Sequence, residues 1–226
     1  MNRTLALTTS ALVVAVLFAP GLLASLVGGY AGVGALRDAL PDAVTGSWLH
    51  GDGSVAGELA DAVSFWATFH VVKALAAALL LAVLVVAVRR ARRGPGRAAL
   101  VALAALAAVV AIVNVQGAVA PLSSLLSMVP AGTADAVLAA DRTPAFTALV
   151  HDFAVYHLAV AVLAGGTAVA VAFLAARSWR HGRRAAAGCA TAAVALLALV
   201  SLANVSTVAA PEPALREFLE ATAAQR

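Results

Sequence analysis

Charged residues are scarce in this chain. Asp, Glu, Lys and Arg make up 12% of its 226 residues, whereas apolar residues make up 63%. Soluble domains contain about 25% charged and about 45–50% apolar residues, so polar side chains could not cover this much apolar surface. The composition therefore predicts an integral membrane protein, with the lipid bilayer as its main partner.

Features that define other protein classes are also missing. The single cysteine, Cys189, lies inside an apolar run, where it can neither close an internal disulfide nor build a metal site alone. The basic residues form short clusters between apolar runs instead of one continuous face, so the sequence pI of about 10.2 does not indicate nucleic acid as a partner. We find no nucleotide-binding loop, ATPase motif or soluble domain.

Five apolar runs are long enough to span a bilayer, which takes roughly 20 helical residues. They cover residues of about 5–27, 62–88, 98–120, 150–176 and 185–210. Arg3 before the first run is also typical of a secretory signal peptide. Because no clean cleavage site precedes a polar start, we expect this run to be retained as a helix. The sequence predicts one all-α membrane domain over 1–226.

Positive charge is distributed unevenly among the segments between these runs. Three segments carry ten arginines and no acidic residue: Arg3, residues 89–97 and residues 177–184. The opposite segments, which hold nearly all 11 acidic residues, are 28–61, 121–149 and the tail after Pro211. Since arginine clusters stay in the cytoplasm, we predict that the N-terminus is inside and the C-terminus outside. Arginine supplies all but one of the 15 basic residues, which is typical of GC-rich bacterial genomes and indicates a bacterial plasma membrane.

The outer segments contain short amphipathic stretches. Residues 122–129 and 214–220 each follow a proline, and residues 28–61 place several apolar side chains among acidic ones. Such stretches can lie at the outer interface as lids over the bundle. Ordinary loops with some apolar anchoring are the alternative.

The second and fourth runs resemble each other. Residues 65–93 match residues 152–180 at an offset of 87, which pairs His70 with His157 and the aromatic residues before them. The third and fifth runs match at an offset of 90 around Asn-Val-x4-Ala-Pro, which pairs Asn114 with Asn204. The sequence therefore predicts a duplicated two-helix hairpin, with copies over about 62–130 and about 150–220.

Four polar residues of these hairpins lie inside the predicted spans. His70 lies nine residues past Asp61, and His157 lies five past Asp152. Asn114 and Asn204 each lie seven residues before a proline. These spacings are about 7–13 Å along a helix. Polar and ionisable groups inside a membrane are candidates for function. Lys73, the only lysine, lies one turn deeper than His70 and on the same helix face.

Several interpretations of these residues stay open. His70 and His157 can be axial ligands of a b-type haem in an electron carrier. Together with His151 and Asp152, they can instead bind Cu, Fe or Zn. A third interpretation is a membrane-embedded oxidoreductase or oxygenase with an outer-leaflet site for a lipophilic small molecule. In this site a histidine acts as base and Asn114, Asn204 and Lys73 stabilise an oxyanion.

The polar set can also be purely structural, since Asn and His often hydrogen-bond across membrane bundles. In that case the chain is a non-enzymatic accessory, transporter or sensor subunit. The sequence leaves the oligomeric state open.

Two stretches resemble a known family. Residues 69–80, with Trp66 before them, and residues 113–125 are similar to motifs of small membrane proteins that include anthrone oxygenase-like enzymes. The resemblance implies oxidation of polycyclic aromatic substrates in some members and carries over only to His70 and Asn114, with His157 and Asn204 through the repeat. Gln116 and Ser206 replace a proline of the family motif, and the chain has five predicted spans where the family has four.

Overall fold

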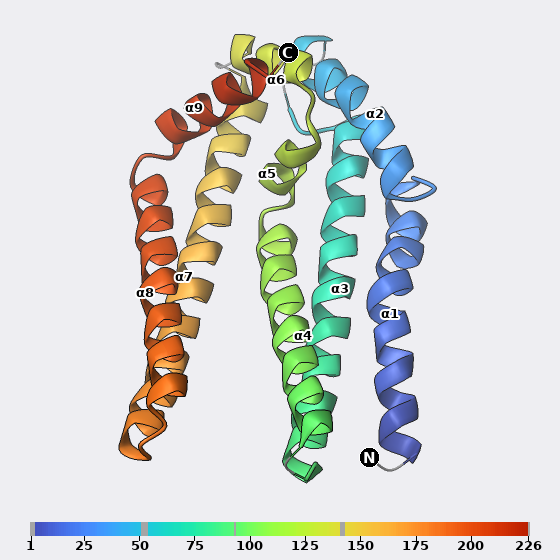
Figure 1. Cartoon of the computed structure of the whole chain (residues 1–226). Helices are drawn as coiled ribbons and strands as arrows, with labels where there is room; N and C mark the ends of the chain where they lie inside the picture. The colour runs from blue at the N-terminus through green and yellow to red at the C-terminus, as the bar shows by residue number, and fades with distance from the viewer. Residues whose placement is uncertain (1–2, 51–53, 93, 141–142, 226) are drawn as a thin grey trace.

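The computed structural model describes residues 3–50, 54–92, 94–140 and 143–225. Over these residues the regular structure is helical, without strands. Five described helices are long and apolar enough to cross a membrane: α1 (Arg3–Gly28), α3 (Gly57–Arg90), α4 (Pro95–Val119), α7 (Pro144–Arg180) and α8 (Arg184–Ala209). They coincide with the five predicted runs, which confirms an all-α multi-pass membrane protein. In Figure 1 the axes of the five helices are roughly aligned, and short helices form a cap at one end.

The long helices leave their large apolar side chains uncovered by protein. Leu22 of α1 is 69% exposed and Phe173 of α7 is 73% exposed. On α8 only Ala187 is buried. Exposure of this much apolar surface to water would cost about 25 cal/mol per Å², whereas acyl chains cover it without that cost. The surface is that of helices embedded in a bilayer.

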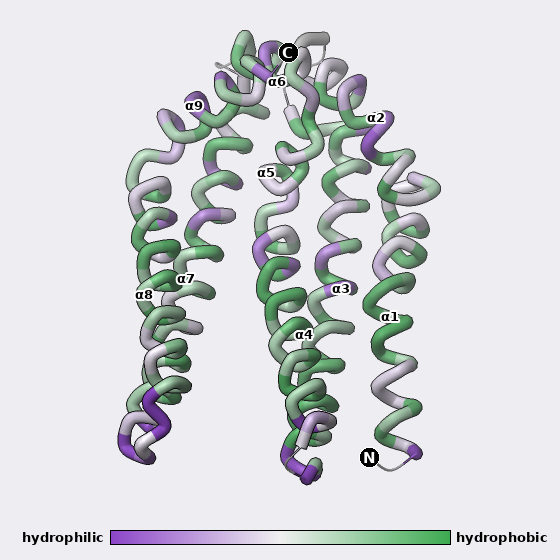
Figure 2. Tube along the Cα trace, in the orientation of Figure 1, coloured by the Kyte–Doolittle hydropathy of each residue, from purple (hydrophilic) through white to green (hydrophobic). Residues whose placement is uncertain are grey.

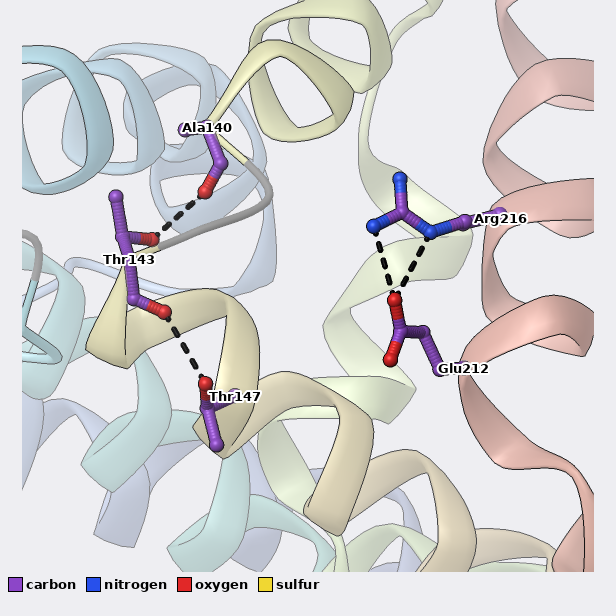
Figure 3. Close-up of polar contacts among 5 residues, drawn as sticks. All are labelled: Ala140, Thr143, Thr147, Glu212 and Arg216. Carbon is purple, nitrogen blue, oxygen red and sulfur yellow. Dashed lines mark hydrogen bonds and ion pairs between the residues drawn. The ribbon is translucent and has the colours of Figure 1, made fainter.

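Helices α3 and α7 are longer than a bilayer requires. They contain 34 and 37 residues, or about 51 and 55 Å at 1.5 Å per residue, against about 30 Å of hydrocarbon. Both start before the predicted runs; α7 does so because Pro144 lies in its first turn and Thr143 is its N-cap. The Thr143 hydroxyl accepts from the Phe146 N–H at 3.2 Å. It donates to the Ala140 carbonyl at 2.9 Å (Figure 3).

Short helices form the cap that surrounds the N-terminal ends of α3 and α7 (Figure 1). They are α2 (Val33–Thr45), the π-helix η1 (Gly46–His50), α5 (Pro121–Leu125), the 3₁₀ helix η2 (Leu126–Met128), α6 (Ala131–Ala139) and α9 (Pro211–Ala223). The predicted amphipathic stretches at 122–129 and 214–220 are therefore helical, in α5–η2 and α9. Residues 28–61 contain α2, whereas α6 was not expected from the sequence.

The cap contains the main buried core. Its fully buried side chains include Leu36, Leu40, Leu59, Phe65, Val137, Leu149, Leu215 and Leu219. Leu36, Leu40 and Val44 lie on one face of α2, at the helical spacing of four residues. The core therefore joins segments that are far apart in the sequence, from α2 to α9.

The spans form two antiparallel hairpins and one additional helix. α3 packs against α4, α7 packs against α8, and α1 packs along α3, where Gly28 contacts Phe65. The two hairpins meet through α4 and α7, and their ribbons diverge toward the end opposite the cap (Figure 1). At that end the hairpin turns are hydrophilic, while the helices above them are mainly hydrophobic (Figure 2).

Candidate functional site

His70 and Asn114 face each other inside the first hairpin. His70 Nδ1 of α3 lies 2.8 Å from Asn114 Oδ1 of α4. Asn114 Nδ2 donates to the Val110 carbonyl at 2.7 Å, and the Asn114 side chain is buried. The structure brings together the first predicted histidine and asparagine in one hydrogen bond.

His157 and Asn204 form the corresponding contact in the second hairpin. His157 Nδ1 of α7 lies 2.6 Å from Asn204 Oδ1 of α8. Asn204 Nδ2 donates to the Val200 carbonyl at 2.8 Å. Both hairpins thus use the same atoms of the same residue types, at the positions that the sequence match pairs.

The asparagine in each pair determines which ring nitrogen of histidine carries the proton. Each Asn amide nitrogen donates to the carbonyl four residues earlier, so the amide oxygen must be the atom that faces the ring. An amide oxygen only accepts hydrogen bonds, hence Nδ1 is the donor. In a neutral imidazole the other nitrogen, Nε2, then holds the lone pair. Both asparagines therefore orient a histidine as a potential base or ligand through Nε2.

The ring of His70 is enclosed by its neighbours. The Trp66 ring lies perpendicular to it at 4.6 Å between centroids. A Cβ at Gly117 would come within 2.7 Å of the His70 ring atoms, so a larger residue there would displace the ring. Trp66 Nε1 is held by the Ser124 hydroxyl at 2.6 Å. The His70 Nε2 atom is buried and has no hydrogen-bond partner among the described residues.

His157 instead lines a cavity beneath α9. The cavity has a volume of about 550 Å³ and lies between α5, η2, α7, α8 and α9. Its apolar lining includes Leu126, Phe153, Ala214 and Phe218, and its polar lining includes Ser123, Ser124, Ser127, Tyr156, Thr207 and Glu217. This size and composition are typical of sites for small molecules. His157 is the member of the predicted set that lines this cavity.

Lys73 lies apart from the cavity lining. Its Nζ is 4.9 Å from the centroid of the Phe69 ring on the same helix, a cation–π contact. Each asparagine uses its amide oxygen for a histidine and one of its two amide N–H groups for a carbonyl. In this geometry the asparagines orient the histidines, and their stabilisation of an oxyanion stays a prediction.

The four predicted metal ligands are not gathered into one group. Nowhere in the described parts of the chain do three or more His, Cys, Asp or Glu residues form a group that could hold a metal ion. His151 is exposed on α7. Asp152 accepts from the Ser123 N–H at 2.7 Å and so caps the first turn of α5. Asp152 therefore has a structural contact that the sequence did not indicate.

The histidines also occupy different surroundings, which bears on the haem interpretation. Two axial ligands must present Nε2 to one slot between them. His157 lines the cavity beneath α9, whereas His70 does not. Trp66 and Gly117 pack directly against the His70 ring and leave no space for a haem on those two sides.

Sequence reasoning missed several residues of the cavity. Phe218 and Glu217 reach it from α9, far along the chain from His157. The Gln116 amide donates to the Tyr156 hydroxyl at 2.8 Å and links α4 of one hairpin to α7 of the other. One signal was available in the sequence. The match at offset 90 aligns Thr207, which lines the cavity, with Gly117 of the first hairpin, so the two copies differ at this position.

Comparisons of this chain with known protein families, with curated proteins and with solved structures found no match.

Proposed function

We propose that this chain is a membrane-embedded oxidoreductase or oxygenase that acts on a lipophilic small molecule in the cavity beneath α9. The observation that carries the proposal is His157, which lines this cavity while Asn204 fixes its proton on Nδ1. Apolar walls from Phe153 and Phe218 suit a lipophilic ring or chain. The proposed substrate carries an acidic hydroxyl group that meets Nε2.

The proposed chemistry begins with proton transfer. His157 accepts the hydroxyl proton through Nε2, and the positive charge that forms is stabilised by the Nδ1–H···Oδ1 bond to Asn204. The resulting oxyanion is electron-rich. The resemblance to anthrone oxygenase-like proteins implies dioxygen as the oxidant. In the proposed step a ring CH carbon of this anion forms a C–O bond to dioxygen, the peroxide takes back the proton from His157, and loss of water leaves a carbonyl group.

We further propose that the two hairpins are copies of one ancestral hairpin, with the N-terminus in the cytoplasm and the C-terminus outside. The matched His–Asn bonds support the duplication, and the arginines at the turns opposite the cap support the orientation. In this proposal the copies have diverged, since Gly117 packs against His70 where the second copy has Thr207 in the cavity. The first pair is then structural and the second carries the site.

A lipophilic phenol serves as a probe of the proposed site. We expect the purified full-length protein to bind naphthol saturably and to produce naphtholate fluorescence. His157→Ala removes the base and should abolish this emission. Asn204→Leu should weaken it on the order of tenfold, because the ring loses its orientation.

His70→Ala is the matched control for these variants. It removes an equivalent histidine and hydrogen bond outside the cavity, so naphthol binding should persist. Equal naphtholate emission from the His157→Ala variant and the original protein would reject the site and favour a non-enzymatic accessory, transporter or sensor subunit. A visible absorption spectrum with elemental analysis distinguishes cofactors: a Soret band lost in both histidine variants indicates a b-type haem, and bound Cu, Fe or Zn indicates a metal site.

A further inference from the structure

A second cavity lies at the end of the bundle opposite the cap. It has a volume of about 770 Å³ and occupies the turn between α3 and α4. Three arginines line it, Arg90 from the last turn of α3, Arg92, and Arg97 from the first turn of α4. Leu100 and Leu103 line the same cavity further along α4. Cationic and apolar side chains therefore line the same cavity.

The positive charge of this cavity has no acidic partner in the described structure. Residues 89–97 contain no Asp or Glu, and no described ion pair involves Arg90, Arg92 or Arg97. The N-terminus of α4 adds to the positive potential, since Gly94 provides no side-chain cap. An anion at this position would pair with the guanidinium groups and lie near the Gly96 N–H, because Pro95 has no N–H and the Arg97 and Ala98 N–H groups donate to the Gly94 carbonyl.

The turn of the other hairpin is closed. Gly182, with φ of 69°, allows a tight turn in which the Arg183 N–H donates to the Ser178 carbonyl and the Gly182 N–H to the Trp179 carbonyl, each at 3.0 Å. In the first hairpin the backbone at Ala91 is extended after α3 ends. The two turns carry similar charge and differ in backbone conformation, and the cavity described above lies at the first.

We propose that this cavity binds the phosphate group of an anionic phospholipid. Arginine binds phosphate oxygens through two parallel hydrogen bonds, and basic pockets at the ends of membrane helices recognise anionic headgroups. Leu100 and Leu103 supply an apolar path for the acyl chain where α4 enters its hydrophobic part (Figure 2). These two leucines favour a lipid over free phosphate. The proposal is independent of the site at His157.

The test uses the full chain in zwitterionic detergent, titrated with short-chain phosphatidylglycerol. We expect one saturable site. The triple variant Arg90→Gln, Arg92→Gln, Arg97→Gln should bind on the order of a hundredfold more weakly, at about fivefold per arginine. The single variant Arg97→Lys keeps the charge but loses the planar fork, and should bind several-fold more weakly; it remains informative if the triple variant does not fold.

The matched control removes three arginines from the closed turn, as Arg180→Gln, Arg183→Gln, Arg184→Gln. It should bind phosphatidylglycerol within about threefold of the original protein, since diffuse surface charge falls off within a Debye length. Equal losses in the two triple variants would overturn the proposal in favour of diffuse attraction. Phosphatidylcholine binding as tightly as phosphatidylglycerol, or inorganic phosphate competing at equal concentration, would overturn the assignment to an anionic lipid.

Discussion

The two histidines show how neighbours decide the role of a side chain. Both donate from Nδ1 to an asparagine on the next helix, so both direct a lone pair away from that helix. Around His70 this direction is closed by protein, with a buried Nε2, whereas His157 lines a cavity. In our proposal the same pair of residues therefore serves as a packing contact in one hairpin and a reactive group in the other.

Substitution of Gly117 tests the packing contact. Gly117→Ala places a Cβ within 2.7 Å of the His70 ring, which must move and lose its hydrogen bond to Asn114. We expect a loss of about 1–3 kcal/mol in the free energy of unfolding, measured as a lower melting temperature in detergent.

Gly166→Ala provides the control for helix propensity. Gly166 lies within α7, and a Cβ there would meet no atom within 4 Å. This variant should be as stable as the original protein or more stable by about 0.5–1 kcal/mol. A Gly117→Ala variant with an unchanged melting temperature would contradict the enclosed position of His70.

At the scale of elements, the cap and the spans differ in what stabilises them. The spans bury few side chains and present the rest to lipid, as on α8. The cap buries large residues from α2, α5, α6 and α9 in one core. Because α9 also forms one wall of the cavity at His157, the core of the cap positions the proposed site.

Substitution of Leu215 on α9 tests whether the cap core positions the proposed site. Leu215 is fully buried in the cap core, and Leu215→Ala should cost about 2–5 kcal/mol. It should also weaken naphthol binding, since α9 no longer packs firmly over the cavity. Leu199→Ala is the matched control, because Leu199 on α8 is 64% exposed; it should change stability by less than about 0.5 kcal/mol. Equal effects of the two substitutions would contradict the role of the cap.

The long helices could be predicted from the sequence because apolar runs of about 20 residues have few alternative structures. The start of α7 at Pro144 was less apparent, since the capping residue Thr143 lies outside the apolar run. Helix α6 was missed because its nine residues include four Ala and only two larger apolar residues, Val137 and Leu138, so that no clear amphipathic face is visible. Its place comes from packing against α9 and α2, which no local pattern encodes.

For the molecule as a whole, the candidate site was only half predictable. The sequence match paired each histidine with its asparagine, and both hydrogen bonds are present, because matched positions on two adjacent helices lie at matched depths. The match could not predict that only the second histidine, His157, lines the cavity beneath α9. That difference depends on α9, which follows the second hairpin. The cavity is a property of the assembled cap, and its lining draws on residues from Ser123 to Ala221.

The proposed orientation of the whole molecule follows from the distribution of its charges. The turns opposite the cap carry arginine clusters, and the described acidic residues lie in the cap helices or near the starts of α3 and α7. The positive-inside rule then places the cap outside. The proposed cavity at His157 would open in the outer half of the membrane, and the arginine cavity at the cytoplasmic surface.

Single cysteines can determine this orientation, because Cys189 is the only native cysteine and is exposed on α8. In a Cys189→Ser background, Ala224→Cys lies at the cap end and His181→Cys in the turn between α7 and α8. With a membrane-impermeant maleimide, we expect intact cells to label Ala224→Cys and to label His181→Cys only after permeabilisation. A membrane-permeant maleimide should label both and so confirm their reactivity. The reverse pattern would place the cap in the cytoplasm, and the cavity at His157 would then take its ligand from the inner leaflet.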